Sequence, residues 1–66
     1  MTIIVNGEAM PLDSPLSIQE WLQSKGLNPA LIAIEYNGKL ITRETYTDIT
    51  LKDGDKLEVV RFVGGG

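Results

Sequence analysis

The sequence predicts a small α+β roll in which a single helix packs on one face of a mixed sheet. One segment, near residues 18–25, has helical periodicity, and short apolar runs on both sides of it are joined by Asn-Gly pairs. A lone amphipathic helix has to bury its apolar side against the sheet, which gives two layers. With 66 residues, the chain fits one domain spanning 1–66 and one core. The expected order of elements is β-β-α-β-β-β.

The first hairpin is predicted from the β-branched run 2–5 and the Asn6-Gly7 pair that follows it. Asn-Gly tolerates the positive φ angles of a two-residue turn, so a return strand is expected at about 9–12. Pro11 has no N–H to donate to a strand ladder. The return strand should therefore lie at the edge of the sheet or end near Pro11.

The helix carries start and stop signals. Ser17 and Glu20 have the spacing of a capping box, which predicts a helix beginning at Ile18. Gly26 suits the left-handed position after the last turn, and Leu27 can then fold back in a Schellman motif. The apolar side of this helix is expected to contain Ile18, Trp21 and Leu22.

The second half of the chain predicts three more strands. The run Leu31–Tyr36 is almost continuously apolar, as in an interior strand, and Asn37-Gly38 turns it into a strand at 39–41. Segment 42–52 is irregular, with core contacts expected from Tyr46, Ile49 and Leu51. A turn at 53–55 then leads into the last strand, 57–62, which runs into the glycines.

Composition excludes several classes of function. The chain has no Cys and no His, which removes disulfides, thiolate catalysis, the usual zinc sites and the commonest general base. Its net charge is -3 and no run of Lys or Arg is present, so nucleic-acid binding is not expected. Neither a signal peptide nor an apolar run long enough to span a membrane is visible. A soluble, cytoplasmic monomer is expected.

Charged residues suggest no catalytic constellation. The acidic pairs Asp53/Asp55 and Glu44/Asp48 are interpreted as turn and surface residues, because neither pair brings further ligands for a metal or an activated nucleophile. Arg43 and Arg61 either grip an acidic partner surface or are simply solvated. No metal site, bound cofactor or enzymatic activity of the chain itself is expected.

The end of the chain is the strongest candidate for a functional segment. If Leu57 and Val59 face the core, then Val60 and Phe62 face solvent, either as a docking patch or as ordinary surface residues. The glycines Gly64, Gly65 and Gly66 carry no side chains, so they can thread a narrow channel and present a carboxylate inside a partner's site. The alternative is a loose end or a remnant of cloning.

Taken together, the β-β-α-β-β-β order, the Asn37-Gly38 turn, the segment 52–60 and the ending Phe62-Val63-Gly64-Gly65-Gly66 resemble the ThiS family of thiamine-biosynthesis sulfur carriers. The resemblance implies a ubiquitin-like β-grasp roll with a flexible C-terminal tail at 63–66. It also implies that an E1-like adenylyltransferase, using ATP and magnesium, adenylates the carboxylate of Gly66. Sulfur from a persulfide enzyme then gives a thiocarboxylate, which thiazole synthase consumes.

The resemblance assigns roles to individual residues. Gly65 and Gly66 are the functional pair, with Gly66 as the modified residue, while Val60, Phe62 and Val63 contact the partner enzymes. The apolar Phe62-Val63 differs from the basic run that precedes the glycines of ubiquitin, which argues against conjugation to other proteins. Two alternatives stay open: a sulfur carrier for molybdopterin synthesis, and a β-grasp interaction module whose glycines are incidental.

Overall fold

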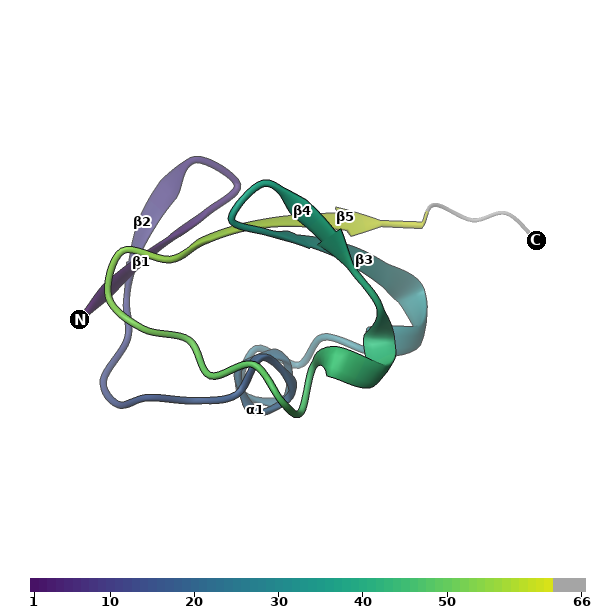
Figure 1. Ribbon diagram of the computed structural model, residues 1–66, viewed down its shortest axis with the longest axis horizontal. Helices are drawn as coiled ribbons and strands as arrows, with labels where there is room; N and C mark the ends of the chain where they lie inside the picture. The colour runs from purple at the N-terminus through teal and green to yellow at the C-terminus, as the bar shows by residue number, and fades with distance from the viewer. Residues whose placement is uncertain (63–66) are drawn as a thin grey trace.

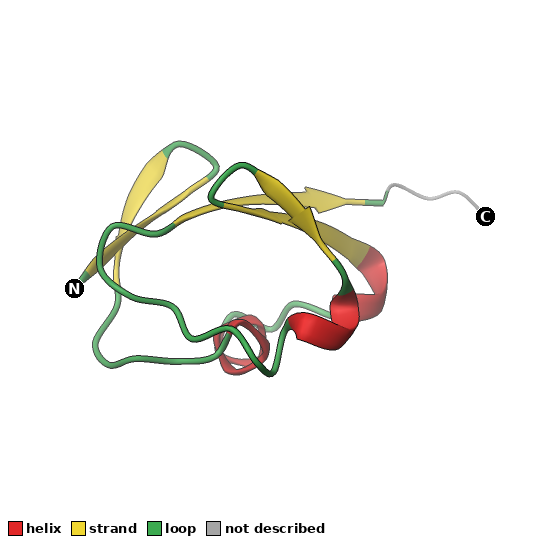
Figure 2. Ribbon diagram, viewed as in Figure 1, coloured by secondary structure: helices red, strands yellow, loops and turns green. Residues whose placement is uncertain are grey.

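The computed structural model describes residues 1–62, so the predicted flexible tail at 63–66 lies outside the described residues. Five strands form one mixed sheet in the order β2-β1-β5-β3-β4, and the helix α1 (Ile18–Ser24) lies on one side of it (Figures 1 and 2). β1 and β5 are parallel, and the other neighbouring strands are antiparallel. The strands are β1 (Thr2–Val5), β2 (Glu8–Pro11), β3 (Ile32–Tyr36), β4 (Lys39–Ile41) and β5 (Lys56–Arg61). The predicted two-layer α+β roll is therefore confirmed.

Both predicted Asn-Gly hairpins are present. Asn6 and Gly7 have φ angles of 51° and 82°, and Asn37 and Gly38 have φ angles of 50° and 85°. Positive φ at both central residues is the type I′ turn that matches the twist of antiparallel strands. Pro11 lies in β2, which is an edge strand, so its missing N–H costs the sheet no interior bond.

The helix begins and ends where its sequence signals predict. The Ser17 hydroxyl accepts a hydrogen bond from the Glu20 N–H at 3.0 Å, and the Glu20 carboxylate accepts one from the Ser17 N–H at 2.9 Å. After α1, Gly26 has a φ of 69°, and the Leu27 N–H donates to the Leu22 carbonyl at 2.9 Å. These contacts are the capping box and the Schellman motif.

The core lies between α1 and the facing side of the sheet. Tyr46 and Leu51 are buried and Ile49 is a partly buried residue packed against the core, as predicted for the irregular segment. This segment contains a short 3-10 helix (Arg43–Thr45). In residues 1–62, no helix has the length and apolar character needed to cross a membrane. The buried hydrophobic residues are Ile3, Val5, Leu12, Ile18, Trp21, Leu22, Ile32, Ile34, Tyr46, Leu51 and Leu57.

Two boundary predictions were wrong. Leu31 is not in a strand but ends a 3-10 helix (Pro29–Leu31), and its side chain is 57% exposed. The cause is local, because the Asn28 side chain accepts a hydrogen bond from the Ala30 N–H and fixes that turn. Phe62 lies just beyond β5, which begins at Lys56 and ends at Arg61.

Candidate functional site

The last strand separates its side chains onto two faces, as predicted. Leu57 is 1% exposed in the core, whereas Val60 is 55% exposed and Phe62 is 62% exposed. Val60 lies opposite Ala33 of β3, so both belong to the face of the sheet that points away from α1, called here the open face. The predicted exposure of Val60 and Phe62 is confirmed, and their contact with partners stays a prediction.

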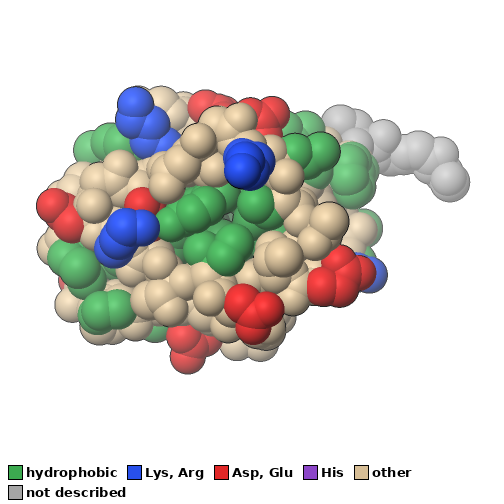
Figure 3. Space-filling model, viewed as in Figure 1, with side chains coloured by type: hydrophobic (Ala, Val, Ile, Leu, Met, Phe, Trp, Pro, Cys, Tyr) green, Lys and Arg blue, Asp and Glu red, His purple; other side chains and the backbone are tan. Residues whose placement is uncertain are grey.

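A backbone hydrogen bond fixes the position of Phe62. Arg61 lies opposite Ile32 in the pairing of β5 with β3, and the Phe62 N–H donates to the Leu31 carbonyl at 2.9 Å. The pairing therefore continues one residue past the strand. In Figure 3, hydrophobic side chains gather beside the place where β5 ends. The predicted site residues Val63, Gly64, Gly65 and Gly66 follow directly and lie outside the described residues.

A groove of about 230 Å³ lies beside the end of β5. Leu31 and Phe62 contribute apolar walls, and Arg61 contributes a positive charge. Arg61 and Arg43 form no ion pair within residues 1–62, where the pair within 4.0 Å is Lys52–Asp55. Both arginines are exposed, so the choice between partner contact and simple solvation stays open for them.

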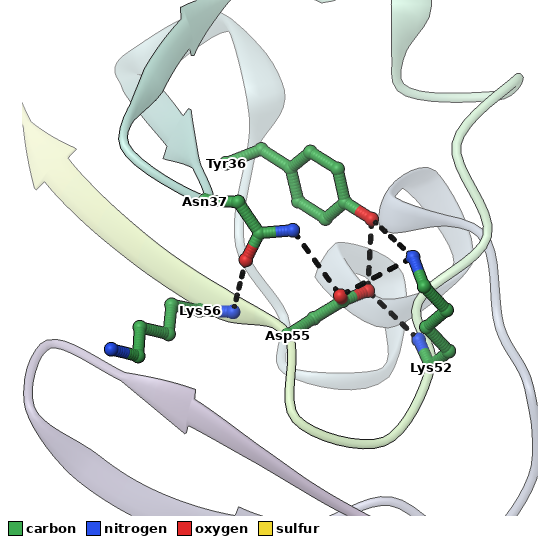
Figure 4. Close-up of polar contacts among 5 residues, drawn as sticks. All are labelled: Tyr36, Asn37, Lys52, Asp55 and Lys56. Carbon is green, nitrogen blue, oxygen red and sulfur yellow. Dashed lines mark hydrogen bonds and ion pairs between the residues drawn. The ribbon is translucent and has the colours of Figure 1, made fainter.

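The prediction that Asp55 is a solvated surface residue was wrong. Its side chain is 3% exposed and accepts hydrogen bonds from the Tyr36 hydroxyl at 2.9 Å, the Asn37 amide at 3.2 Å and the Lys52 N–H at 2.9 Å. Figure 4 shows these groups converging on the carboxylate, with the Lys52 ammonium 3.5 Å away. Asp53 is exposed and accepts a bond from the Thr2 N–H at 2.7 Å.

The contacts of Asp55 also set its acidity. Burial raises the pKa of the Asp55 carboxyl, but the hydrogen bonds from Lys52, Asn37 and Tyr36 and the positive charge of Lys52 outweigh burial. The pKa of Asp55 therefore lies below its ordinary value. Asp55 therefore has a structural role. An ionised carboxylate has no proton to donate, and its oxygens are already occupied by hydrogen bonds from the surrounding donors.

Other acidic residues form no binding constellation in the part of the chain that the structure describes. Glu44 and Asp48 are both exposed, as predicted. No group of three or more potential metal ligands occurs within residues 1–62. The described site therefore consists of the exposed end of β5 and the open face beside it.

Comparisons with a family model, with known sequences and with solved structures all match this chain to the same family. A model described as the ThiS family matches residues 3–66. The sulfur carrier protein ThiS of Bacillus subtilis is 40% identical over 50 residues, which cover 76% of this chain and 76% of that protein. A thiazole synthase of Paramagnetospirillum magneticum is 32% identical over 66 residues; the match covers the whole chain but 20% of the synthase.

A solved structure supports the same fold. The crystal structure of the thiamine biosynthesis protein ThiS from Geobacter metallireducens superposes with a TM-score of 0.86 at 33% identity, and the match covers both chains in full. The identity and the complete coverage confirm the β-grasp fold class.

Proposed function

Because the chain belongs to the ThiS family, we propose that it is a sulfur carrier of thiamine biosynthesis whose reacting group is the carboxylate of Gly66. The observation that carries this proposal is the match of residues 3–66 to the family together with the exposed end of β5. That strand brings Phe62 to the surface, and the glycines follow it after one residue. A segment without side chains is suited to entering a narrow active site.

The chemistry proposed for Gly66 has three steps. A carboxylate is a poor electrophile because its negative charge is shared between two oxygens, so an E1-like adenylyltransferase first joins one oxygen to AMP, releasing pyrophosphate from ATP. The sulfur of an enzyme persulfide then attacks the carbonyl carbon and AMP leaves. Reductive cleavage of the resulting acyl disulfide by a thiol releases the thiocarboxylate. ATP and magnesium belong to the activating enzyme, and the carrier supplies a reagent rather than a catalytic residue.

Thiazole synthase is the acceptor that we propose for this sulfur. Two proteins named thiazole synthase contain a segment similar to the whole chain, and this segment is 20% of each. A carrier segment within a protein named for the acceptor reaction supports a functional link between the two activities. It favours thiamine biosynthesis over molybdopterin synthesis for this chain.

The proposal is tested by intact-mass measurement. The chain is incubated with the adenylyltransferase and persulfide donor of its own organism, ATP and magnesium, and its mass is expected to rise by the exchange of one oxygen for sulfur. Deletion of Gly66 should abolish the exchange and leave the melting temperature unchanged, since residues 1–62 make the described fold. An unchanged mass with enzymes that modify another ThiS protein would disprove the proposal.

Phe62→Ala should slow thiocarboxylate formation by roughly tenfold. A large aromatic side chain that anchors an interface costs about 1–2 kcal/mol when it is truncated, and about 1.4 kcal/mol corresponds to a factor of ten. Phe62→Tyr keeps the ring and should restore most of the rate. The initial rate is measured by mass spectrometry at carrier concentrations below the KM of the activating enzyme, where the rate reports the contact between the two proteins. The melting temperature of each variant is measured alongside. Equal rates for Phe62→Ala and the wild type would exclude Phe62 from the contact with the activating enzyme.

A further inference from the structure

Both hairpins turn on an Asn-Gly pair, a sequence that is prone to spontaneous deamidation. The glycine nitrogen loses its proton to solvent base and attacks the side-chain carbonyl carbon of the asparagine. The bond to Nδ2 breaks, ammonia leaves, and water opens the resulting five-membered imide to aspartate or isoaspartate. Glycine has no side chain to obstruct the attack, so Asn6 and Asn37 are the candidate sites. The third asparagine, Asn28, precedes Pro29, which has no N–H.

The fold holds both candidate side chains away from the following nitrogen. The Asn6 Oδ1 accepts a hydrogen bond from the Val59 N–H at 2.7 Å, and the Asn6 Nδ2 donates to the Val59 carbonyl at 3.3 Å. The Asn37 Oδ1 accepts a hydrogen bond from the Lys56 N–H at 2.8 Å, and the Asn37 Nδ2 donates to the Asp55 carboxylate at 3.2 Å. Each asparagine must therefore give up two hydrogen bonds before its amide can close the ring.

The hydrogen bonds of Asn6 lie at the end of a short strand ladder. β1 and β5 pair through two residue pairs, of which Val5–Leu57 is the last, and the Asn6 side chain continues the pairing to Val59. Both of its bonds are exposed, so water can replace the Asn6 amide on the Val59 N–H and carbonyl. Strand ends with exposed hydrogen bonds open locally, at a small part of the free energy of global unfolding. Asn6 should therefore be released while the chain stays folded.

The bond from Asn37 to Asp55 differs because its acceptor is buried. Asp55 is 3% exposed, and this hydrogen bond is partly buried. The Tyr36 hydroxyl and the Lys52 N–H both donate to Oδ2 of Asp55, and Asn37 donates to Oδ1. Turning Asn37 away takes a donor from a buried, charged oxygen, which costs more than the loss of an exposed bond between neutral groups. Asn37 should therefore be released only when the chain unfolds.

We propose that Asn6 is a modification site of the folded chain, at which spontaneous deamidation forms aspartate or isoaspartate, and that Asn37 is protected until the chain unfolds. This inference does not depend on the chemistry proposed for Gly66. An aspartate at position 6 has no N–H for the Val59 carbonyl and repels it, while an isoaspartate adds a main-chain atom to a two-residue turn. Either product weakens the attachment of the first hairpin to β5.

The test follows both sites by peptide mapping and mass spectrometry while the full chain is incubated at mildly alkaline pH. Each rate is divided by the rate at the same site in concentrated urea, which removes differences in sequence context. The normalised rate should be about tenfold or more higher at Asn6 than at Asn37. At low urea the rate at Asn37 should rise in parallel with the unfolded fraction, while the rate at Asn6 stays nearly constant. Asn28 is the internal control and should not react by this route.

Ile18→Val is the matched variant, because it destabilises the whole chain and leaves the hydrogen bonds of both asparagines in place. Ile18 is fully buried on α1, and loss of one buried carbon should raise the unfolded fraction by about fivefold. The rate at Asn37 should rise by the same factor. The rate at Asn6 should change by less than about twofold, because its release needs only local opening.

Three outcomes would overturn the inference. Equal normalised rates at the two sites would show that the bond to Asp55 gives no additional protection. An absence of product at Asn6 in the folded chain, or a rate there that follows urea and Ile18→Val as steeply as the rate at Asn37, would show that Asn6 also reacts only after unfolding. Rates at both sites equal to those in concentrated urea would show that the fold protects neither. Sulfur transfer at Gly66 is measured separately, so none of these results bears on the proposed function.

Discussion

Asp55→Asn is expected to destabilise the fold by about 3 kcal/mol, through loss of charge-assisted hydrogen bonds and a donor left facing donors. The side-chain amide oxygen of Asn37 (Oδ1) already accepts a hydrogen bond from the Lys56 N–H at 2.8 Å, so the Asn37 amide cannot flip to offer an acceptor without losing that bond. The NH₂ group of the introduced side-chain amide therefore faces an N–H donor of Asn37 or of Lys52, whichever way the amide is turned. A domain of this size is stable by roughly 3–10 kcal/mol, so the loss is a large share.

The measurement is chemical denaturation at neutral pH, with Asp48→Asn as control. Asp48 is exposed, so the same chemical change should alter the free energy of unfolding by less than about 0.5 kcal/mol. Melting temperature should fall by roughly 15 °C for Asp55→Asn. Similar stability of the two variants would show that the contacts of Asp55 contribute little.

The pH dependence of stability should identify the same carboxylate. The pKa of Asp55 is lower in the folded chain than the ordinary value of 3.8, so its ionised form favours folding. This contribution is complete above the unfolded pKa and is lost as pH falls through the folded pKa. The wild type should therefore lose stability below about pH 4 more steeply than Asp55→Asn. Parallel curves would contradict the assignment.

Ile34→Ala is expected to cost about 4 kcal/mol, because it removes a fully buried side chain from the middle of an interior strand. Ile34 lies opposite Ile41 on one side and Val59 on the other, and it faces the core. The cavity left behind has neighbours held by strand pairing, so it cannot close easily. This cost is a large share of the roughly 3–10 kcal/mol by which a domain of this size is stable.

Leu40→Ala is the matched control for Ile34→Ala. Leu40 lies on the neighbouring strand and is largely exposed, so removal of a similar number of carbon atoms should change stability by less than about 0.5 kcal/mol. Both variants are compared by urea denaturation, with equal m-values as a check that the unfolding transition stays two-state. A small effect of Ile34→Ala would mean that the sheet shifts to fill the space.

Short-range signals made much of the fold predictable. The capping box needs residues three apart, and each Asn-Gly turn needs two adjacent residues, so the sequence alone located the helix start and both hairpins. The exposure of Val60 and Phe62 followed from strand alternation once Leu57 was placed in the core. These features depend on little beyond the local chain.

Features that depend on distant residues could not be predicted. Asp55 has the appearance of an ordinary turn residue, and its hydrogen-bond partners Tyr36 and Asn37 lie 19 and 18 residues earlier in the chain. The opposition of Glu35 to Glu58 likewise needs the register between β3 and β5, which no local pattern specifies. With the strand order known, the 53–55 turn would have been placed beside the second hairpin, and Asp55 could then have been predicted to contact Tyr36 and Asn37.

If Gly66 is the reacting residue, as proposed, the hydrogen bond between the Phe62 N–H and the Leu31 carbonyl limits where that reaction can occur. It ties Phe62 to the sheet, so residues 63–66 provide the whole length between that fixed point and Gly66. Four residues span at most about 13–14 Å when fully extended. An enzyme acting on Gly66 must therefore bring its reactive centre within that distance of Phe62. The deeper the reactive centre lies inside the enzyme, the closer the enzyme's surface must come to Phe62.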